Sequence, residues 1–301
     1  MIKDNSLHAT LIGVSALVMW SSLAVLVANV NDIPPFQILA IGMFLGGLAG
    51  AATWPFRPGA WRKALLLPPH IWAIGIYGIF VYHMCFFLAF RWAPPLQANI
   101  INYLWPLFTI VFCSYLPGGK LHSYHVIGLA IGIAGVFVAL LAAPNGLSPE
   151  YFLGYLCALG CALTWSSYTT LCRYFKEIST DSVSGFCFAT AALAFICHLA
   201  FEQTIWPQTH MGFAALFLIG LLPTGIAFYA WDIGVKKGNL LFLSLFSYVT
   251  RIASSIYLWF FGVSQITMGA ALGIALVTAG AALASKELFV RQKKVALVPE
   301  P

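Results

Sequence analysis

The sequence overlies itself when it is shifted by 145 residues. The tripeptide Trp20-Ser21-Ser22 falls on Trp165-Ser166-Ser167. The same offset joins three further pairs, namely Tyr103 and Tyr248, Gly128 and Gly273, and Gly135 and Gly280. One offset carried along a whole chain indicates two copies of a single structural unit. We therefore expect a first copy over residues 1–145, a second copy over residues 146–290 and a polar tail over residues 291–301.

Composition places both copies in a membrane. Of the 301 residues, 61% are hydrophobic and only 8% are charged, whereas about a quarter of the residues in a soluble domain are charged. A helix that crosses a bilayer needs about 20 mostly apolar residues. Ten apolar stretches approach this length, at about 8–28, 36–54, 70–90, 97–115, 123–141, 151–171, 183–202, 211–232, 240–261 and 268–286. The sequence therefore predicts an all-α membrane protein with ten transmembrane helices, five in each copy.

Five is an odd number, so the second copy must start on the opposite side of the membrane from the first. The two copies are then inverted five-helix repeats around a central cavity. Inverted repeats are typical of secondary transporters, which bind substrate near the middle of the bilayer and open to its two sides in turn.

Basic residues predict the orientation of the chain. If the N-terminus is cytoplasmic, the loops on that side carry thirteen basic residues and the opposite loops carry only Arg91, with Arg251 inside a helix. Lysine and arginine are enriched in cytoplasmic loops, so both termini are expected in the cytoplasm of a bacterial inner membrane. Orientation accounts for the net charge of +6, and no nucleic-acid partner is expected.

The strongest polar cluster lies in the ninth apolar stretch. Its members recur at helical spacing and form one stripe: Ser244, Ser247, Tyr248, Arg251, Ser254 and Ser255. The equivalent positions in the fourth stretch are Asn99, Asn102, Tyr103, Pro106, Thr109 and Ile110. A polar face present in both copies predicts the lining of a shared cavity. The alternative is that the hydroxyl groups bond to the backbone of their own helix.

Two titratable residues lie deep in the apolar stretches. Arg251 is near the middle of its helix, where an unpaired charge is costly. It could bind the carboxylate of a substrate, or it could be structural and pair with helix carbonyls or with Asp232. His83, beside Tyr82, could contact substrate or carry a proton, or it could donate to a backbone carbonyl. His198 has no polar neighbours in the sequence, and we expect it to be structural.

Three tryptophans, Trp20, Trp105 and Trp165, are far from the helix ends, where tryptophan usually concentrates. For any one of them, packing in the core is the simplest explanation. If His83, two or three tryptophans and two tyrosines converge, however, they suit a flat, amphipathic, aromatic ligand.

Motifs for catalysis are absent from the sequence. It contains no glycine-rich phosphate loop, HExxH or GxSxG motif, and no nucleophile and base at catalytic spacing. We therefore expect neither an enzyme nor a bound cofactor or metal.

Several motifs together resemble the drug/metabolite transporter superfamily of the EamA type. They are the ten helices in two repeats, the repeated Trp-Ser-Ser, the Tyr-Leu-Trp-Pro of residues 103–106 and the Gly-Leu-Ala-Ile-Gly-Ile-Ala-Gly of residues 128–135. Within the superfamily the chain looks like the bacterial aromatic amino acid exporters. The resemblance implies a monomer that exports by alternating access. It also implies an aromatic pocket at Tyr82, His83, Trp105 and Trp165.

We therefore expect an exporter of aromatic amino acids or similar amphipathic metabolites, with a small-molecule substrate and membrane lipids as its partners. The predicted substrate-binding residues are Tyr82, His83, Asn99, Asn102, Tyr103, Trp105, Trp165, Ser244, Tyr248 and Arg251. The alternatives are a broad drug or cation efflux transporter and, from other classes, a lipid scramblase or a membrane enzyme.

Overall fold

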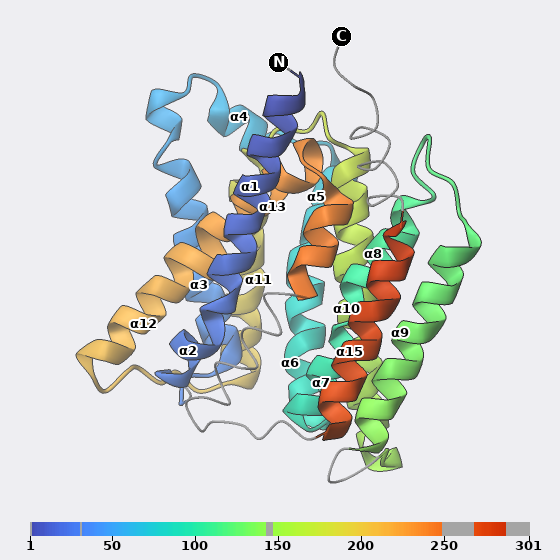
Figure 1. Ribbon diagram of the computed structural model, residues 1–301. Coiled ribbons are helices and arrows are strands. Elements are labelled where there is room, and N and C mark those ends of the chain that lie inside the picture. The colour runs from blue at the N-terminus through green and yellow to red at the C-terminus, as the bar shows by residue number, and fades with distance from the viewer. Residues whose placement is uncertain (1, 31, 143–146, 249–267, 287–301) are drawn as a thin grey trace. The chain divides into compact units, whose positions relative to one another are not determined.

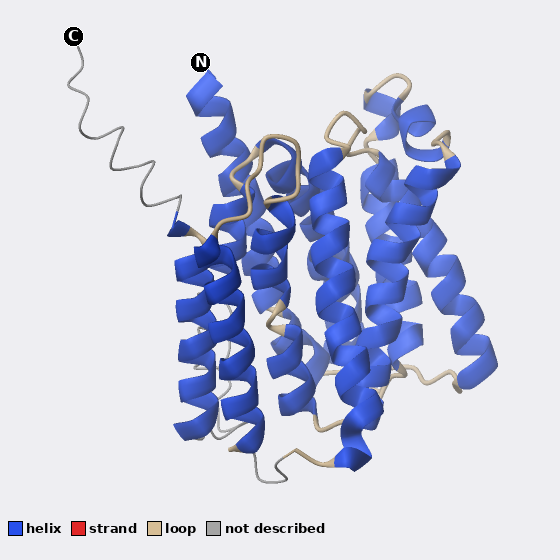
Figure 2. Cartoon of the chain, turned by 90° about the vertical axis from the view of Figure 1, so that its right-hand side faces the viewer, coloured by secondary structure: helices blue, strands red, loops and turns tan. Residues whose placement is uncertain are grey.

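The computed structural model describes residues 2–30, 32–142, 147–248 and 268–286. In these ranges the chain is helical and contains no β-strand (Figure 2). In the first copy the helices are α1 (Ile2–Ser21), α2 (Leu23–Ala28), α3 (Pro35–Ala51), η1 (Trp54–Phe56), α4 (Ala60–Leu65), α5 (Pro69–Ile76), η2 (Tyr77–Val81), α6 (Tyr82–Trp92), α7 (Pro95–Asn102), α8 (Trp105–Cys113) and α9 (Ser123–Leu141). In the second copy they are η3 (Pro149–Tyr151), α10 (Phe152–Tyr174), α11 (Ser182–Phe201), α12 (His210–Leu221), η4 (Leu222–Ile226), α13 (Ala227–Lys237) and α15 (Met268–Ala284), and residues 240–248 are also helical.

Five helical segments are long and apolar enough to cross a membrane. They are Pro35–Phe56, Pro69–Trp92, Ser123–Leu141, Ser182–Phe201 and His210–Lys237. Each coincides with one of the apolar stretches of the sequence. The chain is therefore a multi-pass helical membrane protein.

The helices form two compact units, and neither unit coincides with one sequence copy. Unit 1 consists of Met1–His83 and Leu171–Asn239, and unit 2 consists of Met84–Thr170 and Leu240–Pro301. Each unit therefore combines helices of both copies.

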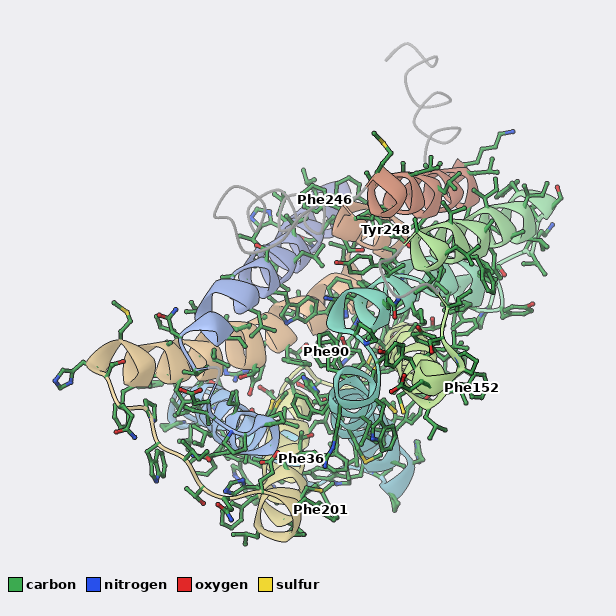
Figure 3. All side chains as sticks on the ribbon, turned by 90° about the horizontal axis from the view of Figure 1, so that it is seen from below. Phe36, Phe90, Phe152, Phe201, Phe246 and Tyr248 are labelled. Atoms are coloured by element: carbon green, nitrogen blue, oxygen red, sulfur yellow. The ribbon has the colours of Figure 1, made fainter. Side chains whose placement is uncertain are left out.

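In unit 1, α3 packs against α11, and α1 packs against α13. The helices α3 and α11 are equivalent in the two copies. They run antiparallel, because Gly47 faces Phe188 while Gly50, further along α3, faces the earlier residue Ser184. Phe36 and Phe201 consequently lie at the same end of the pair (Figure 3). The glycines of the doubled GxxxG motif, Gly42, Gly46 and Gly50, thus make room for neighbours within the chain.

In unit 2, the equivalent helices α9 and α15 lie side by side (Figure 1). A Cβ atom on Gly135 would lie 2.8 Å from the carbonyl oxygen of Gly273, and one on Gly273 would lie 2.7 Å from that of Gly135. Gly128 and Gly280 face each other in the same reciprocal way. Since Gly273 and Gly280 are the equivalents of Gly128 and Gly135, each helix presents the same two glycines to its partner. The pair is antiparallel and locally symmetric.

Two π-helical turns interrupt the third and eighth apolar stretches at equivalent positions. The first is η2 and the second is η4, and their residues differ in number by 145. The second residue is Gly78 in η2 and Pro223 in η4, and both residue types disfavour an α-helix interior. Pro223 has no N–H with which to bond the Ile219 carbonyl, and the Thr224 hydroxyl donates to this carbonyl instead, at 2.8 Å. Turns of this kind are frequent at functional sites.

Candidate functional site

The first set of predicted site residues directly follows the η2 turn, in unit 1. His83 bonds through Nδ1 to the Ile79 carbonyl oxygen at 2.7 Å. A carbonyl can only accept a hydrogen bond, so this bond places a proton on Nδ1. The Tyr82 ring meets the imidazole edge-on, with ring centroids 5.1 Å apart. A hydrogen bond to a backbone carbonyl was one of the alternatives for His83 in the sequence analysis. This bond is present, and it fixes the orientation of the ring.

An aromatic cluster extends from His83 and combines rings of both sequence copies. The His83 ring lies 6.2 Å from Phe228, which is its equivalent in the repeat. Phe228 in turn packs against Trp20 at 5.8 Å, and Trp20 packs against Trp231 at 5.3 Å. The Trp20 indole N–H donates to the Pro223 carbonyl at 2.9 Å. This tryptophan thus ties α1 to the η4 turn. Trp20 was identified from the sequence, and the 145-residue offset identifies Phe228 as the counterpart of His83, whereas Trp231 was not identified.

The second set of site residues surrounds a break in the fourth apolar stretch, in unit 2. The helix α7 ends at Asn102 and α8 begins at Trp105. Pro106 explains the break, because it cannot donate to the carbonyl four residues earlier and its ring crowds that carbonyl. The carbonyl of Tyr103, within the break, accepts a hydrogen bond from the Tyr248 hydroxyl at 3.0 Å. The two equivalent tyrosines of the stripes therefore meet.

The tryptophans predicted to bind substrate also meet in unit 2. Trp105 and Trp165 pack edge to face with ring centroids 6.5 Å apart, and Trp165 lies 5.5 Å from Tyr168. The Trp105 carbonyl accepts hydrogen bonds from the hydroxyls of Ser166, at 2.8 Å, and Thr109, at 2.9 Å. The Ser166 bond joins α10 to α8, and the Thr109 bond lies within α8.

Some of the remaining polar side chains in the two stripes bond to the backbone of their own helix, and others are buried. Thr109 bonds to the backbone of its own helix, and the Ser247 hydroxyl does so too, donating to the Ser244 carbonyl at 2.6 Å. Asn99 is partly buried, and Asn102 and Ser244 are buried. The buried Ser244 hydroxyl has no hydrogen-bond partner among the residues that the structure describes. Arg251, Ser254 and Ser255 lie outside the described residues.

One expectation is wrong for His198, which does have polar neighbours. Its Nδ1 lies 2.9 Å from Glu202 Oε2, and its Nε2 lies 2.9 Å from the Thr204 hydroxyl. Glu202 also accepts bonds from the backbone N–H groups of Phe36, at 3.0 Å, and Gln37, at 3.2 Å, at the start of α3. A carboxylate is favourable at this position because the N-terminus of a helix is electropositive. The spacing of four residues between His198 and Glu202 was a sequence signal that was missed, and Thr204 follows the end of α11.

Asp232, considered above as a partner for Arg251, has other partners. Its Oδ2 lies 2.8 Å from Lys236 Nζ and accepts a hydrogen bond from the Thr180 hydroxyl at 2.7 Å. Lys236 also donates to the Ile178 carbonyl at 2.9 Å. Both charged side chains are 4% exposed. The spacing of four residues between them on one helix was a signal for this pair.

The predicted site residues therefore fall into two groups. Tyr82 and His83 belong to unit 1, with the aromatic cluster of Trp20, Phe228 and Trp231. Asn99, Asn102, Tyr103, Trp105, Trp165, Ser244 and Tyr248 belong to unit 2. Both groups combine aromatic rings with hydrogen-bonding groups, a combination typical of sites for planar ligands that have a polar end.

Comparison with known proteins agrees with this architecture. The profile of the EamA-like transporter family matches residues 8–141 and, a second time, residues 152–286. The aromatic amino acid exporter YddG of Ancylobacter novellus is 40% identical over 279 residues, which cover 92% of this chain and 96% of the relative. YddG of Salmonella typhimurium and YddG of Escherichia coli are each 28% identical, over 83% and 82% of this chain.

A solved crystal structure shows the same fold. Its TM-score with this chain is 0.79 and its sequence identity is 39%. The matched region covers 95% of this chain and 98% of the solved chain. Two matches to the family profile, in the two sequence copies, account for nearly all of the sequence. The chain belongs to the EamA-like transporter family.

Proposed function

We propose that this transporter exports aromatic amino acids across the bacterial inner membrane by alternating access. The observation that carries the proposal is the 40% identity to an aromatic amino acid exporter along 92% of the chain. The two aromatic groups support it, because each offers ring faces together with hydrogen-bonding groups, as the side chain and the polar end of an aromatic amino acid require.

The proposed architecture is ten membrane-spanning helices in two inverted repeats, 1–145 and 146–290, with a cytoplasmic tail over 291–301. The antiparallel packing of α9 with α15 supports the inversion, because equivalent helices of a directly repeated unit would run parallel. The reciprocal contacts of Gly135 and Gly273, and the bond between Tyr248 and Tyr103, fit a twofold relation between the copies. Because the basic residues concentrate in the loops of one side, we propose that both termini are cytoplasmic, and we also propose a monomer.

We propose that predicted residues of both units contact substrate during the transport cycle, whereas Trp20, which is bonded to the η4 turn, supports unit 1 without touching substrate. Tyr82 and His83 contribute from unit 1. In unit 2 the contributors are Asn99, Asn102, Tyr103, Trp105, Trp165, Ser244 and Tyr248, with Arg251 as a partner for the substrate carboxylate. The 2.7 Å bond to Ile79 holds the His83 ring in one orientation, which suits a residue that positions a ligand.

Counterflow in liposomes tests this function. Wild type and the His83→Ala variant are reconstituted in separate vesicles. Uptake of labelled Phe is measured in exchange for one unlabelled compound inside the vesicles, which is Phe, Tyr, Trp, Leu, Lys or a bulky organic cation. We expect exchange with the three aromatic amino acids, and a rise of about tenfold or more in the KM of the variant, because one lost polar contact typically costs 1 to 3 kcal/mol.

The control variant is His210→Ala, since His210 is exposed at the start of α12, and its KM should match wild type. Preference of the wild type for the organic cation would instead indicate broad drug or cation efflux. If the KM of the His83→Ala variant equals that of wild type, His83 does not belong to the substrate site. This result would not contradict the proposed transport function.

A further inference from the structure

A cavity with charged side chains in its lining lies at one end of unit 1, and none of the predicted site residues lines it. Its volume is about 520 Å³, within the usual range for small-molecule sites. It is formed by the segment that joins α10 to α11, the last turns of α13 and the segment before α4. The charged side chains that line it are Arg57, Lys176, Glu177, Asp181, Lys236 and Lys237.

The charge of the cavity favours an anion. Four of the lining side chains are basic and two are acidic. Arg57 pairs with Asp181 at 2.6 Å, and Lys236 pairs with Asp232 at 2.8 Å. Glu177 offsets one of the two remaining lysines. A single net positive charge is left, which one phosphodiester group would balance.

Two of the basic side chains are available to a ligand. Lys176 and Lys237 are exposed, and neither makes an ion pair or hydrogen bond with another residue in the described part of the chain. They come from different segments, one after α10 and the other at the end of α13, and both line the cavity. By contrast, the Lys236 ammonium is bonded to the Ile178 carbonyl as well as to Asp232.

The chain next to the cavity has the character of a membrane interface. Beside Arg57, the Phe56 side chain is 85% exposed, and in and after α4 the exposed fractions are 45% for Trp61 and 67% for Leu66. The Arg62 guanidinium lies 5.3 Å above the Trp61 ring. The helix α4 packs against α11, close to the Asp181 end of that helix, where the cavity lies. Aromatic and basic side chains that alternate in this way suit the level of the lipid headgroups.

We propose that this cavity binds the phosphodiester headgroup of an anionic phospholipid such as phosphatidylglycerol. Lys176 and Lys237 contact the phosphate, and Phe56, Trp61 and Leu66 lie along the upper part of the acyl chains. Basic pockets among membrane helices on the cytoplasmic side are known to take such headgroups. The exposed apolar side chains favour a lipid over a soluble phosphate compound, because only a lipid has acyl chains that can contact them.

The test is native mass spectrometry of the full-length protein, titrated in detergent with phosphatidylglycerol or with phosphatidylcholine of the same acyl chains. Wild type should bind phosphatidylglycerol more tightly than phosphatidylcholine. In the double variant Lys176→Gln/Lys237→Gln this affinity should fall about 25-fold, since each basic group near an anionic lipid contributes a factor of about five. Both lysines are exposed, so the variant should fold.

Two further variants separate this site from a general effect of charge. Lys120→Gln/Lys286→Gln removes two charges from exposed lysines of unit 2 and should leave the affinity within about twofold of wild type. Glu177→Gln removes the acidic neighbour and should tighten binding about fivefold.

The proposal is wrong if the Lys176→Gln/Lys237→Gln variant binds phosphatidylglycerol as wild type does. It is also wrong if both double variants lose affinity equally. Displacement of the lipid by millimolar inorganic phosphate would instead identify a site for soluble phosphate compounds, and this result too would overturn the assignment to a lipid.

Discussion

The two compact units use equivalent helices in different ways. In unit 2, α9 and α15 meet through glycines on both sides, and each backbone approaches the other. In unit 1, Gly42, Gly47 and Gly50 of α3 face the side chains of Thr224, Phe188 and Tyr229, while Gly46 faces the backbone of Thr224 and Gly225. Within the described residues, the ion pairs Arg57–Asp181 and Lys236–Asp232 and the hydrogen-bonded pair His198–Glu202 all belong to unit 1. Hydrogen bonds between helices occur in both units, as Trp20 to Pro223 in unit 1 and Tyr248 to Tyr103 in unit 2 show. Within the described residues, what distinguishes unit 1 is its buried Lys236–Asp232 pair, and what distinguishes unit 2 is the reciprocal glycine contact of α9 with α15.

The same contrast applies to the two tryptophans of the repeated Trp-Ser-Ser motif. In unit 1, Trp20 donates its indole N–H to the backbone of the η4 turn. In unit 2, Trp165 packs edge to face against Trp105, which has been linked above to substrate binding. Trp20 and Trp165 are equivalent in the two copies, but their neighbours differ, and the two tryptophans therefore make different contacts. We therefore propose that Trp20 contributes to stability and that Trp165 contacts substrate.

The largest effect is expected for the ion pair of unit 1. Asp232→Asn leaves the Lys236 ammonium buried without its counter-ion, and we expect a loss of about 3 to 5 kcal/mol in the free energy of unfolding. The thermal unfolding midpoint of the purified protein measures this change. The double variant Asp232→Leu/Lys236→Met should recover most of the stability, because an apolar pair needs no counter-charge. An unchanged midpoint in the single variant would contradict the view that unit 1 depends on this pair.

A smaller effect is expected where backbones meet in unit 2. A Cβ atom in Gly135→Ala would lie 2.8 Å from the Gly273 carbonyl oxygen, so the helices must move apart, at a cost of about 1 to 3 kcal/mol. The matched control is Gly160→Ala in α10, where the new Cβ would lie 3.5 Å from the Cys85 sulfur, an ordinary contact. The control should be neutral or stabilising by up to about 1 kcal/mol. Equal thermal midpoints for the two variants would show that α9 and α15 are not closely packed.

The smallest effect on stability is expected for Trp20→Phe. The variant keeps an aromatic ring beside Phe228 and Trp231 but removes the 2.9 Å bond to the Pro223 carbonyl. We expect a loss of about 1 kcal/mol, the usual contribution of one such hydrogen bond, again measured as the thermal midpoint. A midpoint equal to that of wild type would show that the indole bond does not stabilise unit 1.

Much of the fold could be predicted from the sequence, because apolar length and the 145-residue offset are both visible in it. The offset also anticipated that equivalent groups would meet, as Tyr103 does with Tyr248. The composition of the two units could not be predicted, since it depends on which helices pack together and each copy contributes to both. The π turns were also missed. Gly78 and Pro223 are their signals, but either residue also occurs in ordinary membrane helices.

The candidate site was predicted less completely. Trp105 and Trp165 meet as expected, and the backbone bond of His83 was one of two alternatives for that residue. The contact of His198 with Glu202 was missed although the two are four residues apart, and Thr204 lies beyond the helix. Hydroxyls such as that of Thr109, which bonds to its own helix, show that a polar stripe alone does not distinguish a ligand from a backbone carbonyl. Only the positions of neighbouring atoms decide between them.

The most direct test of the account compares the two tryptophans in one transport assay. The KM for labelled Trp is measured by counterflow in liposomes for wild type, Trp165→Phe and Trp20→Phe. Loss of one specific apolar contact changes discrimination about tenfold, so we predict a KM about ten times that of wild type for Trp165→Phe and an unchanged KM for Trp20→Phe. A wild-type KM for Trp165→Phe, in vesicles where wild type itself exchanges Trp, would contradict the assignment of Trp165 to substrate recognition.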